Sequence, residues 1–182
     1  VYKLSQNDQR RFYELGIHTV KDFASADLEQ LRFRLEDWQF DKLLRFYNQA
    51  QVLVSNEPRI LKKSELPKVE NEIYFDIESD PTEGIDYLLG MLMKKGGREP
   101  EYKYFLAKDK EDEARIWREF LDFLESLNDF VIYHYSYYER EVFKRLANKY
   151  GISMALEDKF KNNAIDLHWK FIEAAVLPIY FY

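Results

Sequence analysis

The sequence predicts an α/β domain at residues 71–182, preceded by a small all-α domain at residues 1–56 and a linker at residues 57–70. Two observations support this prediction. Three β-favouring segments follow one another through short turns, and helical patterns then alternate with one more apolar segment. Before the linker, by contrast, apolar residues recur at helical spacing, and prolines with mixed charge mark the boundary.

Four helices are expected in the all-α domain. Ser5, Thr19 and Asp27 each precede a helical pattern and are residues that favour the N-cap position, while Gly16 is placed to end the first helix. The fourth helix is the longest and is expected to reach about Val54.

Part of the all-α domain carries a local resemblance. The phrase Leu15-Gly16-Ile17-His18-Thr19-Val20-Lys21-Asp22-Phe23-Ala24 resembles a helix-hairpin-helix module. In such modules, two short helices around a glycine-bearing turn present backbone N–H groups to a phosphate. His18 stands where a second hairpin glycine is usual. A small helical bundle docked on its neighbour accounts for the same pattern, so both interpretations stay open.

The α/β domain is expected to begin with an antiparallel meander. An amphipathic helix follows, and then a short apolar strand that is typical of a buried parallel strand beside the first. The strands are expected at residues 72–78, 87–93, 101–107 and 130–133, and the helices at 111–127, 138–150 and from 165 or 166 to about 176.

Composition limits the classes of function. The 182 residues are 46% hydrophobic and 33% charged, which is a globular balance, and they include no cysteine. Disulfides, zinc ribbons and cysteine nucleophiles are therefore excluded, and a cytoplasmic setting is favoured. No apolar run is long enough for a membrane span. The net charge of −6 argues against a purely electrostatic nucleic-acid binder, but it is compatible with an acidic metal site.

One acidic pair lies on the first predicted strand. Because side chains alternate along a strand, Asp76 and Glu78 share one face, while Phe75 and Ile77 point into the opposite layer. Neighbouring carboxylates repel each other, and a fold tolerates that mainly where a divalent cation lies between them. A second acidic position, Glu139, follows the fourth predicted strand in the first turn of a helix. The alternative role for it is to complement the positive end of the helix dipole.

Five segments also carry a resemblance. They are Asp76–Pro81, Tyr87–Gly90, His134–Glu139, Ile165–Leu167 and Leu177–Tyr180, and together they resemble one family over about residues 70–182. It is the RNase H-like domain, of DEDD exonuclease type, in predicted nucleases of the RecB family. The resemblance implies a three-layer RNase H-like fold that hydrolyses nucleic-acid phosphodiester bonds with two Mg²⁺ or Mn²⁺ ions, as a 3′–5′ exonuclease. It also implies DNA more often than RNA as partner, no membrane, and further nuclease or helicase modules fused or associated.

The resemblance also implies roles for individual residues. Asp76 and Glu78 would be metal ligands of the first motif, and Glu139 would be the acid of the second. His134, at the end of the fourth strand, would line or orient the site. Asp166 falls where related exonucleases have an aspartate at the start of a helix, either as a cap or as a metal ligand. The family's last acidic residue would lie beyond this sequence, so a C-terminally truncated chain with an incomplete metal site is expected.

Two alternatives stay open. Asp86, Glu101 and Lys103 have the rough spacing of restriction-like nucleases, in which the lysine assists the attacking water. The second alternative belongs to another class. It is a catalytically silent module that binds nucleic acid or protein and keeps a degenerate metal site.

Overall fold

The computed structural model describes residue 1 and residues 3–180. The chain divides into two compact units, one formed by Val1–Ser64 with the segment from Phe171 onward, and the other by Glu65–Lys170. Each unit has its own buried cluster of hydrophobic side chains. The chain passes from one unit to the other twice, after Ser64 and again after Lys170, within the last helix. Each unit is described by itself.

The first unit is a small helical bundle with a two-stranded ribbon. Ser5, Thr19 and Asp27 each accept a backbone N–H in the first turn of the helix that follows, as predicted from their residue types. Phe12, Phe23 and other apolar side chains from all four helices form the core. The elements are α1 (Gln6–Glu14), α2 (Val20–Ser25), α3 (Leu28–Arg34), α4 (Phe40–Ser55) and β1 (Arg59–Ile60), which pairs antiparallel with β7 (Ala175–Val176).

The second unit is built on a five-stranded mixed sheet with the strand order β4-β3-β2-β5-β6. The first three strands form an antiparallel meander, while β5 runs parallel to β2 and β6 runs parallel to β5. This bears out the predicted α/β class, with a meander followed by helices around a parallel strand. The strands are β2 (Asn71–Asp80), β3 (Ile85–Lys95), β4 (Glu101–Leu106), β5 (Val131–His134) and β6 (Ala164–Asp166).

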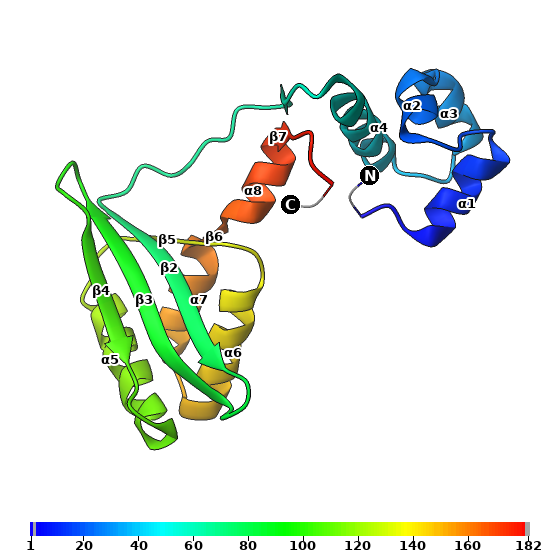
Figure 1. The fold of residues 1–182 in the computed structure, drawn as a ribbon. Helices are drawn as coiled ribbons and strands as arrows, with labels where there is room; N and C mark the ends of the chain where they lie inside the picture. Colours follow the sequence, from blue (N-terminus) through cyan, green and yellow to red (C-terminus); the bar gives the residue numbers. More distant parts are fainter. Residues whose placement is uncertain (2, 181–182) are drawn as a thin grey trace. The chain divides into compact units, whose positions relative to one another are not determined.

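Helices cover one face of this sheet. Figure 1 shows α5 (Glu113–Glu125), α6 (Tyr138–Tyr150) and α7 (Met154–Asn163) together behind β2, β3 and β4. Ile73, Phe75 and Ile77 of β2 are buried against this helical layer, whereas the residues between them are less buried or exposed. The alternation expected for β2 is therefore present, and it leaves one face of β2–β4 with exposed side chains.

Three features near the C-terminal end differ from the expectation. Helix α7 and strand β6 were not predicted, because α7 buries only Leu156 and Phe160 among many charged residues, and β6 has only three residues. The last helix, α8 (Leu167–Ala174), begins later than predicted, and residues 175–176 form β7 instead of its final turn. Pairing of β7 with β1 competes successfully with continuation of the helix.

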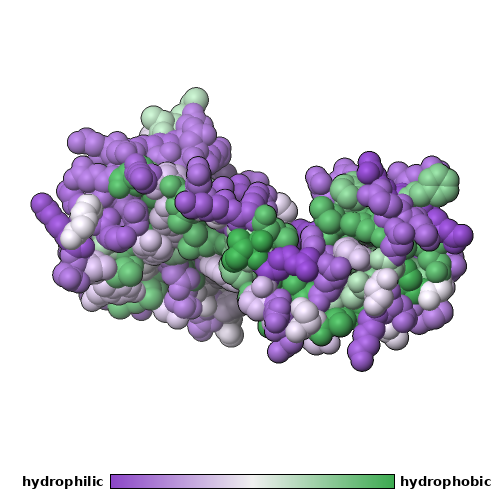
Figure 2. All heavy atoms as spheres, turned by 90° about the horizontal axis from the view of Figure 1, so that it is seen from above, coloured by the Kyte–Doolittle hydropathy of each residue, from purple (hydrophilic) through white to green (hydrophobic). Residues whose placement is uncertain are grey.

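The surface mixes polar and apolar side chains. Figure 2 shows hydrophilic residues (purple) over much of the visible surface, with hydrophobic residues (green) among them. Among the described residues, no helix is both long and apolar enough to cross a membrane.

Candidate active site

Two carboxylates lie in the middle of the sheet on its exposed face. Asp76 and Glu78 are exposed on β2, while Phe75, before them, and Ile77, between them, are buried. In the pairing with β3, Asp76 lies opposite Gly90, and a β-bulge follows directly after Glu78. A bulge bends its strand and re-aims the side chains beside it. The sequence therefore places both carboxylates where a polymer can approach them.

The turn after β5 is held by His134. This residue ends β5, is 2% exposed, and its Nδ1 lies 2.7 Å from the carbonyl oxygen of Ser136. A carbonyl oxygen only accepts, so Nδ1 carries the proton. Burial lowers the pKa of His134 more than this hydrogen bond raises it, so the ring is neutral at physiological pH. Ser136 has a φ of 74°, a strained conformation for a residue with a side chain, which these contacts hold in place.

Glu139 brings a third carboxylate to the site. It lies in the first turn of α6, is 6% exposed, and its Oε2 has no hydrogen-bond partner among the described residues. Burial raises the pKa of Glu139, a hydrogen bond to its own backbone N–H lowers it, and the nearby carboxylates of Asp76 and Asp166 raise it further. Three separate elements, β2, α6 and β6, therefore direct negative charge at one region.

Asp166 connects β6 to the same turn. Its Oδ1 accepts the backbone N–H of Ser136 at 3.0 Å and that of Trp169 at 3.0 Å. The second bond satisfies an N–H in the first turn of α8, which is a capping interaction. The carboxylate thus ties the strained turn to the end of β6 while it caps a helix. The predicted residues Asp76, Glu139, His134 and Asp166 come together, with Glu78 two positions along β2 from Asp76.

The donors of this site suit a hard divalent cation, since carboxylate oxygens are the ligands that Mg²⁺ and Mn²⁺ prefer. Oε2 of buried Glu139 accepts no hydrogen bond among the described residues, and the His134 Nδ1 that lies 3.8 Å from it is bonded to the Ser136 carbonyl oxygen. This is consistent with a cation site, because a buried charge is costly without a positive partner. The side chains do not form a closed cage, however. Among the described residues, no group of three or more acidic or histidine side chains is arranged to hold one metal ion.

A buried ionic network lies beside the site and was not foreseen from the sequence. Asp86 is 2% exposed and accepts two hydrogen bonds from Arg145 of α6, at 2.6 and 2.8 Å. Its backbone N–H donates to Glu113, a carboxylate 1% exposed that is also bound by Lys149 and by the Tyr150 hydroxyl. The network joins β3, α5 and α6. The only signal in the sequence was the acidic residue within an otherwise apolar strand.

The strand register separates the residues of the restriction-like alternative. Asp86 pairs across the hairpin with Ser79, at one end of β3, whereas Lys103 lies opposite Met91 and Glu101 opposite Met93. Five residues of strand between the Asp86 and Met91 positions correspond to about 17 Å. Asp86 is moreover paired with Arg145. The structure therefore does not bring Asp86, Glu101 and Lys103 together, and the prediction of a D…E-x-K site is wrong.

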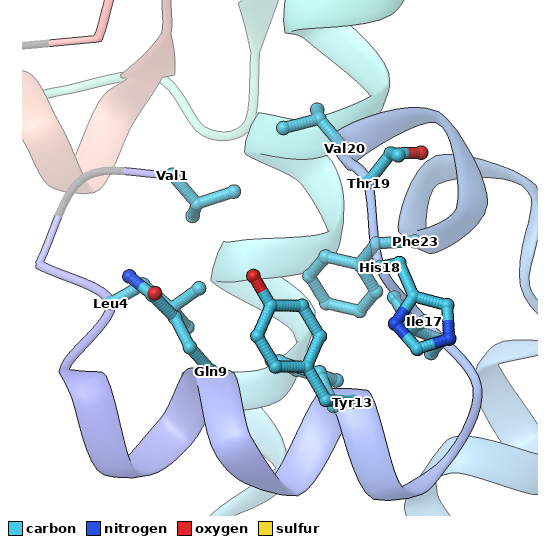
Figure 3. A pocket seen from close by; sticks show the side chains of 10 residues that line it. Val1, Leu4, Gln9, Tyr13, Ile17, His18, Thr19, Val20 and Phe23 are labelled. Atoms are coloured by element: carbon cyan, nitrogen blue, oxygen red, sulfur yellow. The ribbon is translucent and has the colours of Figure 1, made fainter.

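The backbone N–H groups in the hairpin of the helical unit are already bonded to the carboxylate of Asp22. Gly16 has a φ of 78°, and the rings of Tyr13 and His18 stack at 5.4 Å beside a mainly apolar pocket (Figure 3). The backbone N–H groups of His18 and Thr19 both donate to Asp22, at 3.1 and 2.7 Å. These are the groups that a phosphate would need in a helix-hairpin-helix module, so a ligand there would have to compete with a carboxylate.

The strand order, the parallel pairing of β2 with β5 and the carboxylates on β2 and α6 define a class, the RNase H-like domains that act on nucleic acids. The family model of the RNase H superfamily matches residues 73–179, and the chain belongs to this superfamily. Membership suggests nuclease activity, and nucleases of this type generally use divalent metals. Comparisons with curated proteins and with solved structures found no match.

Proposed function

We propose that the chain is the catalytic domain of a metal-dependent nuclease that acts as a 3′–5′ exonuclease on DNA. One observation carries the proposal. In a chain of the RNase H superfamily, Glu139 of α6 lies close enough to Asp76 of β2 for their charges to interact. The choice of an exonuclease rests on the resemblance of the order of elements to the DEDD type. The RecB-family relationship and the associated modules stay predictions from the sequence.

Each residue has a role in this proposal. Asp76 and Glu78 present carboxylates on the exposed face of the central strand, where a phosphodiester can reach them. Glu139 faces the same region from a buried position and would be the ligand that gains most from a cation. Neutral His134 and capping Asp166 hold the turn that leads into α6. Divalent ions bound to these carboxylates would help to ionise the attacking water and would stabilise charge on the leaving oxygen.

The first test is cleavage of a single-stranded DNA oligonucleotide labelled at its 5′ end, with Mg²⁺ or Mn²⁺. A 3′–5′ exonuclease yields a ladder of labelled products that shorten stepwise with time. Asp76→Asn and Glu139→Gln should each lower the rate at least about 100-fold, as expected for loss of a group that stabilises the transition state. Glu101→Gln and Lys103→Ala are matched controls on the same sheet and should cleave like the parent chain.

A second readout separates metal binding from catalysis. Mn²⁺ should raise the melting temperature of the parent chain, because a ligand that binds only the folded state stabilises it. Asp76→Asn should lose this shift. Cleavage that persists in Asp76→Asn would overturn the proposal.

The catalytically silent module remains the second candidate. It is favoured by one observation, the lack of a closed set of three metal-binding side chains among the described residues. DNA binding without cleavage, and without any effect of Mn²⁺ on melting, would support it over the nuclease.

The helical unit would guide DNA only if its hairpin can exchange Asp22 for a phosphate. Asp22→Asn weakens the competing acceptor while it keeps the side chain's shape. The helix-hairpin-helix interpretation predicts that this substitution raises the affinity of the chain for duplex DNA. Unchanged affinity would leave the unit as a helical bundle. Thr19→Val, which disrupts the cap of α2 and leaves Asp22 in place, is the control for a general loss of local order.

A further inference from the structure

The exposed face of the sheet carries aromatic side chains beside the candidate carboxylates. Tyr102 and Tyr104 on β4 are 58% and 56% exposed, and their rings stack at 5.7 Å with an interplanar angle of 25°. Lys103 and Phe105 point to the helical layer instead, where the Lys103 ammonium lies over the ring of Phe123. The two tyrosines therefore stand on the same side of the sheet as Asp76.

The strand register fixes how far these rings lie from the carboxylates. Asp76 on β2, Gly90 on β3 and Tyr104 on β4 are directly opposite one another, in one row across the three strands. Neighbouring strands are about 4.8 Å apart, so the backbones of Asp76 and Tyr104 are about 10 Å apart. At about 3.4 Å per stacked nucleotide, roughly three nucleotides of one strand cover this distance.

Gly90 leaves room for the side chain of Tyr102 on the exposed face of the sheet. A Cβ atom at this position would come within 2.8 Å of the Tyr102 hydroxyl, so any side chain there would push the ring away. Since Gly90 is paired on both sides in the middle of a sheet, its lack of a side chain costs strand stability. The gain is that the hydroxyl end of Tyr102 lies over Gly90, in the row that contains Asp76.

The neighbouring row is also largely apolar. Tyr102, Leu92 and Tyr74 lie opposite one another across β4, β3 and β2, and each is at least 37% exposed. Aromatic faces next to a phosphodiester site are suited to unpaired bases, because every base offers a π-face and stacking is tolerant of sequence. A duplex hides those faces within its own stack. The face therefore fits a single strand better than a double helix.

We propose that the exposed face of β3 and β4 is a binding site for the single-stranded part of the substrate, where Tyr102 and Tyr104 stack on bases within three nucleotides of the phosphodiester at Asp76. This inference rests on the proposed nuclease function. It adds a substrate class, an unpaired strand, and assigns residues that hold it away from the carboxylates.

The test measures binding of a fluorescent oligothymidylate by anisotropy, with the whole chain and with EDTA present so that no hydrolysis occurs. Tyr102→Ala and Tyr104→Ala should each weaken binding about tenfold. Tyr102→Phe and Tyr104→Phe keep the rings and should bind within about twofold of the parent chain. Phe33→Ala removes an exposed aromatic ring from α3 of the helical unit, outside its hairpin, and is the matched control, expected to bind like the parent chain.

A set of oligonucleotides, each with one abasic site, locates the stacked bases. The parent chain should lose affinity for abasic sites at one or two positions, and Tyr104→Ala should show no further loss at its position. Gly90→Ala should reproduce part of the tyrosine effect without any change to a carboxylate. Equal affinity of parent and alanine variants, equal losses in the phenylalanine variants, or a change in oligomeric state in place of the affinity change would overturn the proposal.

The two levels of proposal fail in different ways. If the tyrosine variants lose affinity while no variant or parent chain cleaves DNA, the stacking site stands and the nuclease function fails. If Asp76→Asn abolishes cleavage while the alanine variants bind and cleave like the parent chain, the nuclease stands and the stacking site is overturned.

Discussion

The hydroxyl of Tyr138 donates to Oγ of Ser79 at 2.6 Å, and this bond joins the two elements that carry the candidate carboxylates. Ser79 follows Glu78 on β2, and Tyr138 precedes Glu139 on α6. The Ser79 hydroxyl donates in turn to buried Asp86. The spacing between the β2 and α6 carboxylates is therefore set by a chain of hydrogen bonds as well as by the hydrophobic core.

Tyr138→Phe tests whether this bond positions the site. The substitution keeps the ring and removes one hydrogen bond, which contributes about 0.5–1.5 kcal/mol to stability. We expect kcat to fall about tenfold with little change in KM, because misplaced carboxylates weaken the transition state more than substrate binding. Tyr137→Phe is the control, since Tyr137 is the adjacent residue and is 73% exposed. Equal kcat values for the two variants would show that the bond has no positioning role.

Removing Arg145 from its pair with Asp86 should cost more folding free energy than neutralising Asp86. Arg145→Met leaves a carboxylate that is 2% exposed without its cation, and such a loss costs roughly 3 kcal/mol. Asp86→Asn leaves a neutral amide that still accepts hydrogen bonds from Arg145 and Ser79, so its cost should be about half as large.

Urea unfolding of each variant measures these free energies. Lys144→Met, on the exposed face of the same helix, should change stability by no more than about 0.5 kcal/mol. A larger loss for Asp86→Asn than for Arg145→Met would contradict the prediction.

The features that the sequence predicted are those encoded locally. Caps at Ser5, Thr19 and Asp27 depend on residues within three positions, and the alternation of Asp76 and Phe75 depends on one strand. The order of strands followed from short turns and from one apolar segment typical of a parallel strand. Such signals survive without knowledge of the tertiary structure.

The ionic network could not be predicted because its partners are far apart in sequence. Asp86 and Glu113 are 27 positions apart, and Asp86 and Arg145 are 59 apart. Each residue alone reads as an ordinary surface charge, and only the packing of α5 and α6 on the sheet buries the carboxylates. The same limit applies to the row of Asp76, Gly90 and Tyr104, which exists only through strand register.

Glu113 should make stability depend on pH. Burial raises its pKa, but hydrogen bonds from the Asp86 N–H, Lys149 and Tyr150 outweigh burial, so the pKa is lowered from the ordinary value of 4.5. A carboxyl with a lowered pKa in the folded state stabilises the fold above its unfolded pKa. That contribution is lost as the pH falls through the folded pKa.

Glu113→Gln should therefore destabilise the chain at pH 7 by about 1–3 kcal/mol, as expected for a buried hydrogen-bonded charge. The difference in stability between the variant and the parent chain should shrink as the pH falls below about 4.5. Thermal melts over a pH series measure it. Glu111→Gln, at an exposed position nearby, should show no such dependence, and a pH-independent cost for Glu113→Gln would contradict the argument.

Glu139→Gln should show the opposite trend, because burial and neighbouring carboxylates raise the pKa of Glu139. A raised pKa means that the folded state holds the proton more tightly than the unfolded state. The resulting stabilisation is full at pH values below the unfolded pKa and is lost as the pH rises through the folded pKa. At pH values above the folded pKa, the parent chain therefore carries an ionised carboxylate in a position that disfavours it.

The substitution should raise the melting temperature at pH 7 by about 2–4 °C, which corresponds to about 1 kcal/mol in a chain of this size. It should have no effect below about pH 4, while nuclease activity is lost at least about 100-fold. Mn²⁺ should reduce the difference in melting temperature between the variant and the parent chain, because it stabilises the parent chain and not the variant. Glu141→Gln, an exposed glutamate in the same helical turn, is the control and should change neither property. A variant that is both less stable and inactive would show that Glu139 maintains the fold. It would contradict the view that Glu139 belongs to a functional site that lowers stability.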